Sequence, residues 1–162
     1  MGTTERSYAC SWRIYLNTMT IEETREVIIP YFEERQGFLD YKHNEQLLIN
    51  NNGYRIRPDD AFYYPDKVLL FEYENNARPV ESISKYYWLL ENTNWLKENI
   101  RIQFLITVNN ANLNNIRSES IQILGEGLNQ QYPNNFDFHF LNYAELTEEN
   151  ILAELNKMTS VN

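Results

Sequence analysis

The chain has 162 residues, of which 43% are hydrophobic and 14% aromatic, and its formal net charge is −9. This length fits one domain with a real core, and this composition excludes a disordered chain. The acidic balance argues against a protein that coats nucleic acid through a general basic field. It leaves room for a small acidic site with a local basic rim.

The sequence contains one cysteine, Cys10, no signal-peptide pattern and no apolar run of transmembrane length. A single cysteine excludes an internal disulfide and favours a reducing compartment. The hydropathy pattern gives no reason to expect a membrane partner. We therefore expect a soluble, cytoplasmic protein.

The N-terminal part begins with residues 7–17, which fit a strand or a helix equally well. Thr20 is a good N-cap for a helix over residues 20–36, in which Pro30 is expected to cause a kink or a break. Gly37 should end this helix. A short strand is then predicted over residues 46–50, followed by an Asn-rich turn that ends at Gly53.

The second half alternates helices and strands, which predicts parallel additions to a sheet. Two glycines, Gly125 and Gly127, weaken the second half of its middle helix. The predicted elements are a helix from Pro79 to about Glu91, a strand over 101–108, a helix from Leu113 to about Gln131, a strand over 136–141 and a last helix over about 147–158.

Residues 54–75 are predicted to form a β-hairpin with its turn at Pro65-Asp66. The second arm begins with a continuous apolar run, Val68 to Phe71, which is typical of a strand covered on both faces. With a two-residue loop, Ala61 pairs with Leu70, so this register places Asp59 opposite Glu72 and Asp60 opposite Phe71.

Side-chain alternation then puts Asp59, Glu72 and Glu74 on one face of the hairpin. Like charges facing each other roughly 5 Å apart destabilise a sheet, so a hard cation such as Mg²⁺ is expected between them. The alternative is ordinary cross-strand ion pairing, since Arg57 falls opposite Glu74 in the same register. A loop one residue longer would bring Asp60 opposite Glu72 in place of Asp59.

The pattern Pro58-Asp59, a spacer and then Glu72-Tyr73-Glu74 resembles the restriction-endonuclease-like, or PD-(D/E)XK, nuclease superfamily. The resemblance implies an α/β fold. It also implies a single restriction-endonuclease-like domain over residues 1–162, with its core at about residues 20–142. That core is a mixed β-sheet, an antiparallel hairpin plus parallel strands, flanked by helices in the order α-β-β-β-α-β.

By this resemblance the protein would be a metal-dependent phosphodiester hydrolase, a DNA endonuclease that uses Mg²⁺ or Mn²⁺. Asp59 and Glu72 would be metal ligands, with Glu74 as a further ligand that orients or deprotonates the attacking water. The family usually has Lys where this chain has Glu74. Lys85 is therefore the candidate for the missing positive charge, although it also fits an i,i+4 pair with Glu81.

Arg55, Arg57 and Arg78 lie close to this site in sequence and are candidates for binding flanking phosphates, or else are ordinary salt-bridge partners. DNA is the expected partner. A homodimer is plausible because a duplex has two strands to cut, and a partner protein is the other option.

Two other interpretations stay open. One is a catalytically inactive binding or assembly module with the same fold, in a nucleic-acid-processing or mobile-element system; the aromatic run Tyr86-Tyr87-Trp88 would suit a partner interface. The other is an unrelated α/β domain in which the acidic residues are structural.

Overall fold

The computed structural model describes residues 18–48, 55–74, 79–92, 101–108 and 115–160. Its elements in chain order are α1 (Ile21–Glu33), β1 (Asp40–His43), β2 (Leu47–Leu48), β3 (Arg55–Ile56), β4 (Asp60–Tyr63), β5 (Lys67–Glu74), α2 (Pro79–Asn92), β6 (Arg101–Val108), α3 (Asn115–Gln131), β7 (Phe136–Leu141), the 3₁₀ turn η2 (Tyr143–Glu145) and α4 (Glu148–Ser160).

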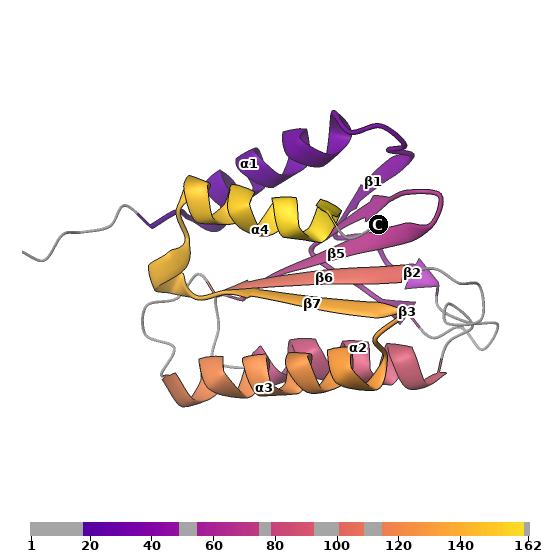
Figure 1. Cartoon of the computed structure of the whole chain (residues 1–162), viewed down its shortest axis with the longest axis vertical. Helices are drawn as coiled ribbons and strands as arrows, with labels where there is room; N and C mark the ends of the chain where they lie inside the picture. Colours follow the sequence, from indigo (N-terminus) through magenta and orange to yellow (C-terminus); the bar gives the residue numbers. More distant parts are fainter. Residues whose placement is uncertain (1–17, 49–54, 75–78, 93–100, 109–114, 161–162) are drawn as a thin grey trace, which may run out of the picture.

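Within these residues the protein has three layers. A five-stranded sheet lies in the middle, with α1 and α4 on one face and α2 and α3 on the other (Figure 1). The strand order is β1-β4-β5-β6-β7, in which β1, β4 and β5 are antiparallel neighbours while β6 and β7 continue in parallel from β5. The protein is therefore α/β with a mixed sheet, as the sequence predicted.

The predicted hairpin register is confirmed. Ala61 lies opposite Leu70 and Asp60 opposite Phe71, and Tyr64 N donates to Lys67 O at 3.0 Å across the turn. This register fixes which side chains at the end of β5 share a face.

The first strand of the meander was predicted at the wrong place. It is β1, at Asp40–His43, whereas β2 belongs to a separate two-stranded sheet with β3. β1 is an edge strand of mostly polar residues, and within the described part of the chain it pairs with β4 alone, so it shows no hydrophobic alternation in the sequence. The Asn-rich turn predicted at residues 50–53 and the ambiguous segment at residues 7–17 lie outside the described residues.

β5 and β6 are buried on both faces, which explains their continuous apolar runs. The core consequently divides into two clusters, one on each side of the sheet. Tyr86 of α2 and Phe104 of β6 lie in the first cluster, with ring centroids 4.2 Å apart. Phe32 of α1 and Phe71 of β5 lie in the second, 5.7 Å apart.

α1 begins as predicted at Thr20, which forms a capping box with Glu23. Of the kink or break expected at Pro30, the break does not occur, since the helix continues to Glu33 with Pro30 inside it. Near the end of a helix proline removes one backbone donor without breaking the turns before it. Gly37, at φ +88°, lies in the turn beyond the helix and not directly at its end.

None of the helices in the described ranges combines the length and the apolar character that a membrane span needs.

α3 runs unbroken through its two glycines to Gln131. A Cβ atom built on Gly125 would overlap the ring of Phe138 on β7, whereas one on Gly127 would meet open space. Gly125 therefore allows α3 to pack closely on the sheet, and this packing outweighs the helix propensity that glycine lacks.

The two glycines make a matched pair for substitution. Gly125→Ala should lower the free energy of unfolding by about 1–3 kcal/mol, because the added methyl group overpacks the contact with Phe138. Gly127→Ala should leave it unchanged or raise it by up to about 1 kcal/mol through helix propensity. Urea denaturation of both variants measures this, and equal effects would contradict the close packing at Gly125.

Candidate functional site

Two glutamates end the central strand β5, and both are almost completely buried: Glu72 is 5% exposed and Glu74 is 6% exposed. They are separated by one residue, so they point to the same face of the sheet, the face covered by α2. Glu72 Oε1 lies 3.0 Å from Lys85 Nζ and accepts a 2.5 Å hydrogen bond from the Tyr86 hydroxyl. Glu74 Oε1 accepts a hydrogen bond from the Ser82 hydroxyl.

The three donors come from a single side of α2. Ser82, Lys85 and Tyr86 are spaced three and four residues apart, which places them together on a helix. A buried carboxylate is strongly disfavoured unless it is paired and hydrogen-bonded, so these donors are what allows β5 to end in two acids. The docking of α2 on the sheet and the position of the acids therefore depend on each other.

Asp59 completes the acidic group from the neighbouring chain segment just before β4. Its Oδ2 accepts a 2.8 Å hydrogen bond from the backbone N–H of Tyr73, the residue between the two glutamates. Its negative charge contributes to raising the pKa of both Glu72 and Glu74. The structure thus brings together four residues that the sequence singled out for the site: Asp59, Glu72, Glu74 and Lys85.

Burial dominates the electrostatics of this group. It raises the pKa of Glu72 to about 7, against the opposing effects of the Lys85 charge and the Tyr86 hydrogen bond. Burial also raises the pKa of Glu74, which the Ser82 hydrogen bond and the Lys85 charge partly offset. Among the described residues, Lys85 is the cation that acts on both buried acids, so within this part of the chain the ionised acids outnumber the positive charge that faces them.

Asp60, the neighbour of Asp59, points to the opposite face of the sheet. It is fully buried, and the guanidinium of Arg25 on α1 donates hydrogen bonds to both its oxygens, at 2.8 and 3.0 Å. The Tyr41 hydroxyl donates to its Oδ1 at 2.6 Å, and His43 Nδ1 lies 2.9 Å from the same oxygen. Asp60 therefore anchors α1 and β1 to β4, and Asp59 is the aspartate on the side of the glutamates.

The cross-strand pairing of Arg57 with Glu74, which was the alternative to a metal site, is not seen. β4 begins at Asp60, so Arg57 precedes the ladder, and no ion pair joins it to Glu74 among the described residues. Arg55 and Arg57 instead line a surface hollow of about 480 Å³ together with Ile56, Lys85 and Trp88. We refer to these five residues as the basic hollow. Arg78, the third predicted phosphate ligand, lies outside the described residues.

Lys85 links the two features, since it lines the basic hollow and contacts Glu72. Any anion bound in the hollow would therefore lie beside the buried acids. Three cations converge here in a chain with a net charge of −9, which is a strong local departure from the overall acidic surface.

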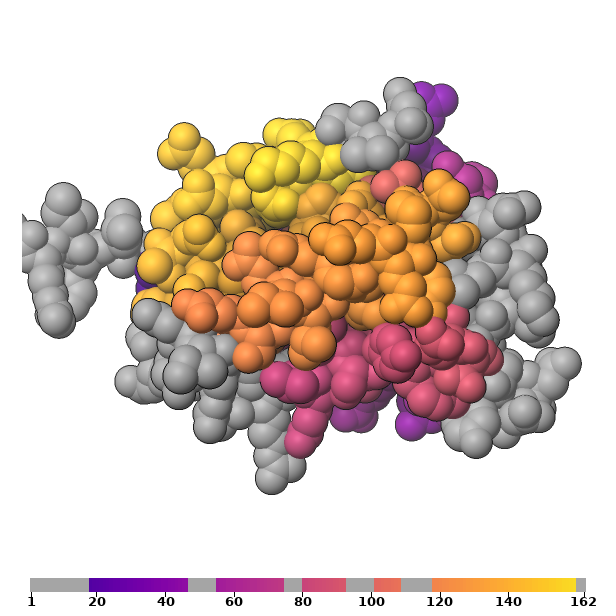
Figure 2. All heavy atoms as spheres, turned by 60° about the horizontal axis from the view of Figure 1, so that its bottom comes forward, coloured from indigo at the N-terminus to yellow at the C-terminus, as the bar shows by residue number. Residues whose placement is uncertain are grey.

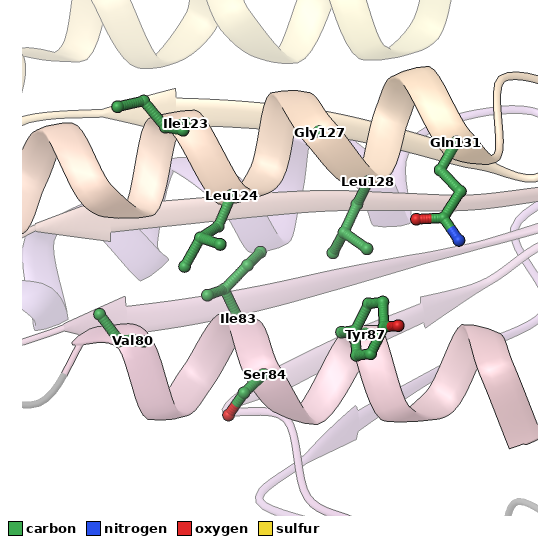
Figure 3. A pocket seen from close by; sticks show the side chains of 9 residues that line it. All are labelled: Val80, Ile83, Ser84, Tyr87, Ile123, Leu124, Gly127, Leu128 and Gln131. Carbon is green, nitrogen blue, oxygen red and sulfur yellow. The ribbon is translucent and has the colours of Figure 1, made fainter.

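A second concave surface has a different character. Between α2 and α3 lies a groove of about 470 Å³, in which Ile83 of α2 approaches Leu124 and Leu128 of α3 (Figure 3). Figure 2 looks onto the face on which these two helices lie side by side. Tyr87 lines the groove and is 50% exposed. Among the described residues that line it, none carries a charge, so this apolar groove is unsuited to binding phosphate.

The acids offer a metal ion one unsatisfied oxygen. Glu74 Oε2 is buried and has no hydrogen-bond partner among the described residues, which is costly for a carboxylate oxygen unless a cation binds there. Across the same described ranges, no cluster of three or more His, Cys, Asp or Glu side chains is already arranged as a metal-binding group. The donor set of carboxylate oxygens is nevertheless of the kind that Mg²⁺ and Mn²⁺ prefer.

Sequence reasoning did not identify the roles of Ser82, Tyr86 and Trp88. The signal for the first two was available, because they share a helical face with Lys85, which was identified. No local signal connects Arg25 with Asp60, which lies 35 positions further along the chain.

No protein-family model, no curated protein and no solved structure matches this chain.

The adjacent aspartates should respond differently to the same substitution. Asp60→Asn should lower the free energy of unfolding by about 3 kcal/mol or more, because it removes the charge that compensates Arg25 in a buried pair. Asp59→Asn keeps an acceptor for Tyr73 N–H at a partly exposed position, so its effect should stay within about 1 kcal/mol. Urea denaturation compares the two, and equal losses would contradict these assignments.

The pH dependence of the free energy of unfolding should reflect the raised pKa of Glu72. Because the pKa is about 7 in the folded protein and 4.5 is its ordinary value, the folded state holds this proton more tightly. The resulting stability is fully present below pH 4.5 and is lost as the pH rises through about 7; its size is up to about 3 kcal/mol.

Urea denaturation in EDTA from pH 4.5 to 8 tests this with the variant Glu72→Gln, whose loss of stability over that range should be smaller than that of the wild type. The exposed Glu119→Gln serves as the control and should follow the wild type. His139 also has a raised pKa, because its bonds to Asp137 and Glu154 outweigh the lowering effect of burial. Its titration is the same in all three proteins, so it does not affect the comparison. Parallel profiles for Glu72→Gln and the wild type would show that Glu72 is not perturbed.

Proposed function

We propose that this protein is a metal-dependent phosphodiester hydrolase that acts on nucleic acid, with Asp59, Glu72 and Glu74 as the metal-binding carboxylates. The observation that carries the proposal is the pair of buried glutamates at the end of β5, joined through Lys85 to the basic hollow. Buried acids with a raised pKa beside a cationic surface are more typical of functional sites than of ordinary strand ends.

The unpaired Glu74 oxygen supports a metal at this position, as does the surplus of negative charge over Lys85 among the residues that the structure describes. Asp59, Glu72 and Glu74 would hold Mg²⁺ or Mn²⁺ through carboxylate oxygens. When bound, such an ion polarises a phosphate and lowers the pKa of an attacking water.

The protein's own residues have separate tasks in this proposal. Tyr86 and Ser82 orient the two glutamates through their hydroxyl groups. Lys85, which reaches from Glu72 to the hollow, stabilises negative charge that develops on the phosphate. Glu74 orients the attacking water and accepts its proton. Arg55 and Arg57 bind phosphates on either side of the reacting one.

The topology supports the proposal. Apart from the separate sheet of β2 and β3, the chain order is α1-β1-β4-β5-α2-β6, with three antiparallel strands and then a parallel one, which is compatible with the α-β-β-β-α-β order that the PD-(D/E)XK resemblance implies. The family usually has a lysine at the position of Glu74, and in this proposal Lys85, whose Nζ reaches the Glu72 carboxylate, takes its place.

One observation favours a second candidate, a nucleic-acid-binding module without catalysis. Glu72 already has a lysine and a tyrosine hydroxyl as partners. In this alternative Lys85 replaces the metal as the counter-charge, and the basic hollow binds nucleic acid that is not cut.

Cleavage assays with Mg²⁺ or Mn²⁺ on single-stranded and duplex DNA and RNA distinguish the two candidates. We expect metal-dependent cleavage that falls at least a hundredfold in Glu72→Gln and in Glu74→Gln, because each loses a charged ligand. The exposed Glu119→Gln should retain full activity.

Calorimetric titration with Mn²⁺ provides the second readout. Binding in the wild type that is lost in Glu74→Gln supports the metal site directly. Nucleic-acid binding with neither cleavage nor Mn²⁺ binding would instead establish the non-catalytic module.

A further inference from the structure

The basic hollow has a composition that goes beyond phosphate binding. Besides its three cations it contains the aromatic ring of Trp88 and the apolar side chain of Ile56, which is only 6% exposed. Its volume of about 480 Å³ lies in the range of roughly 300–1,000 Å³ that is usual for ligand sites. A site for phosphates alone has no need of a flat apolar surface.

Trp88 is partly buried, packs against the core cluster beneath α2 and lines the hollow. A ring held in this way loses little entropy when another flat ring stacks on it. Base stacking on an aromatic side chain surrounded by cations is how proteins bind single-stranded nucleic acid. The faces of bases in a duplex are covered by their neighbours, and only their edges are accessible in the grooves.

We propose that the basic hollow binds single-stranded nucleic acid, with one unpaired base stacked on Trp88 and the flanking phosphates on Arg55, Arg57 and Lys85. The choice of nucleic acid as the ligand rests on the function proposed above, and the inference adds that the strand is unpaired. The strand then passes beside Glu72, since Lys85 belongs to both features.

The neighbouring residue offers a matched control. Tyr87 is also an aromatic residue of α2 but lines the apolar groove, whose lining has no cation (Figure 3). Substitution of Tyr87 by leucine changes the same helix and removes the same kind of ring without altering the basic hollow.

The experiment is a binding titration in EDTA, which removes catalysis from the readout. The sequence has three tryptophans, so a protein carrying Trp12→Phe and Trp95→Phe reports on Trp88 alone. It is titrated with a twelve-nucleotide single strand of DNA, the same strand of RNA, and the corresponding DNA duplex. We expect saturable quenching of Trp88 fluorescence by a single strand, with much weaker binding of the duplex; the DNA and RNA arms identify the sugar.

Variants in the otherwise wild-type chain locate the contacts, with affinity measured by fluorescence anisotropy of a labelled strand. Trp88→Leu should weaken single-strand binding about tenfold or more, Trp88→Phe should retain most of it, and Tyr87→Leu should match the wild type. Arg57→Gln should weaken binding and reduce the slope of log affinity against log salt concentration by about 1, because one phosphate contact is lost. Circular dichroism confirms folding of each variant.

Equal or tighter binding of the duplex, or equal effects of Trp88→Leu and Tyr87→Leu, would overturn the inference. Its failure is distinguishable from failure of the hydrolase. Metal-dependent cleavage of duplex without single-strand binding removes only the inference, while single-strand binding without cleavage removes only the hydrolase and retains the inference.

Discussion

The burial of two carboxylates at the end of β5 is the constraint on which the rest of the structure depends. A strand covered on both faces leaves its side chains no water, so Glu72 and Glu74 need partners from the protein itself. α2 supplies them through Ser82, Lys85 and Tyr86. The arrangement positions this helix, raises the pKa of the acids and carries Lys85 to the edge of the basic hollow.

The two faces of the sheet divide the acidic residues into two kinds. Asp60 is saturated by Arg25, Tyr41 and His43 and holds the layer of α1 in place. Asp59, one residue earlier, lies on the side of the glutamates and adds to their excess charge. Strand alternation is enough to separate the aspartate that anchors α1 from the aspartate of the proposed site, although the two side chains are chemically identical.

Charge is distributed unevenly over the molecule. A chain with a net charge of −9 gathers three cations around one hollow, so an anionic polymer is attracted locally and repelled elsewhere. If the ligand is nucleic acid, as proposed, such a surface favours contact with a short stretch of strand over coating of a long duplex. The apolar groove between α2 and α3 is a separate surface with no charged lining residue.

The sequence by itself determined most helices, the buried strands β5 and β6, the hairpin register and the shared face of the acids, because local periodicity encodes each of them. It missed β1, a polar edge strand, and left open whether Arg57 pairs with Glu74. Only the tertiary structure decided that Arg25 binds Asp60, that Lys85 binds Glu72 and that Gly125 meets Phe138. The partners in each pair lie 13 to 35 residues apart in sequence and belong to different elements, so their contacts form only when the chain packs.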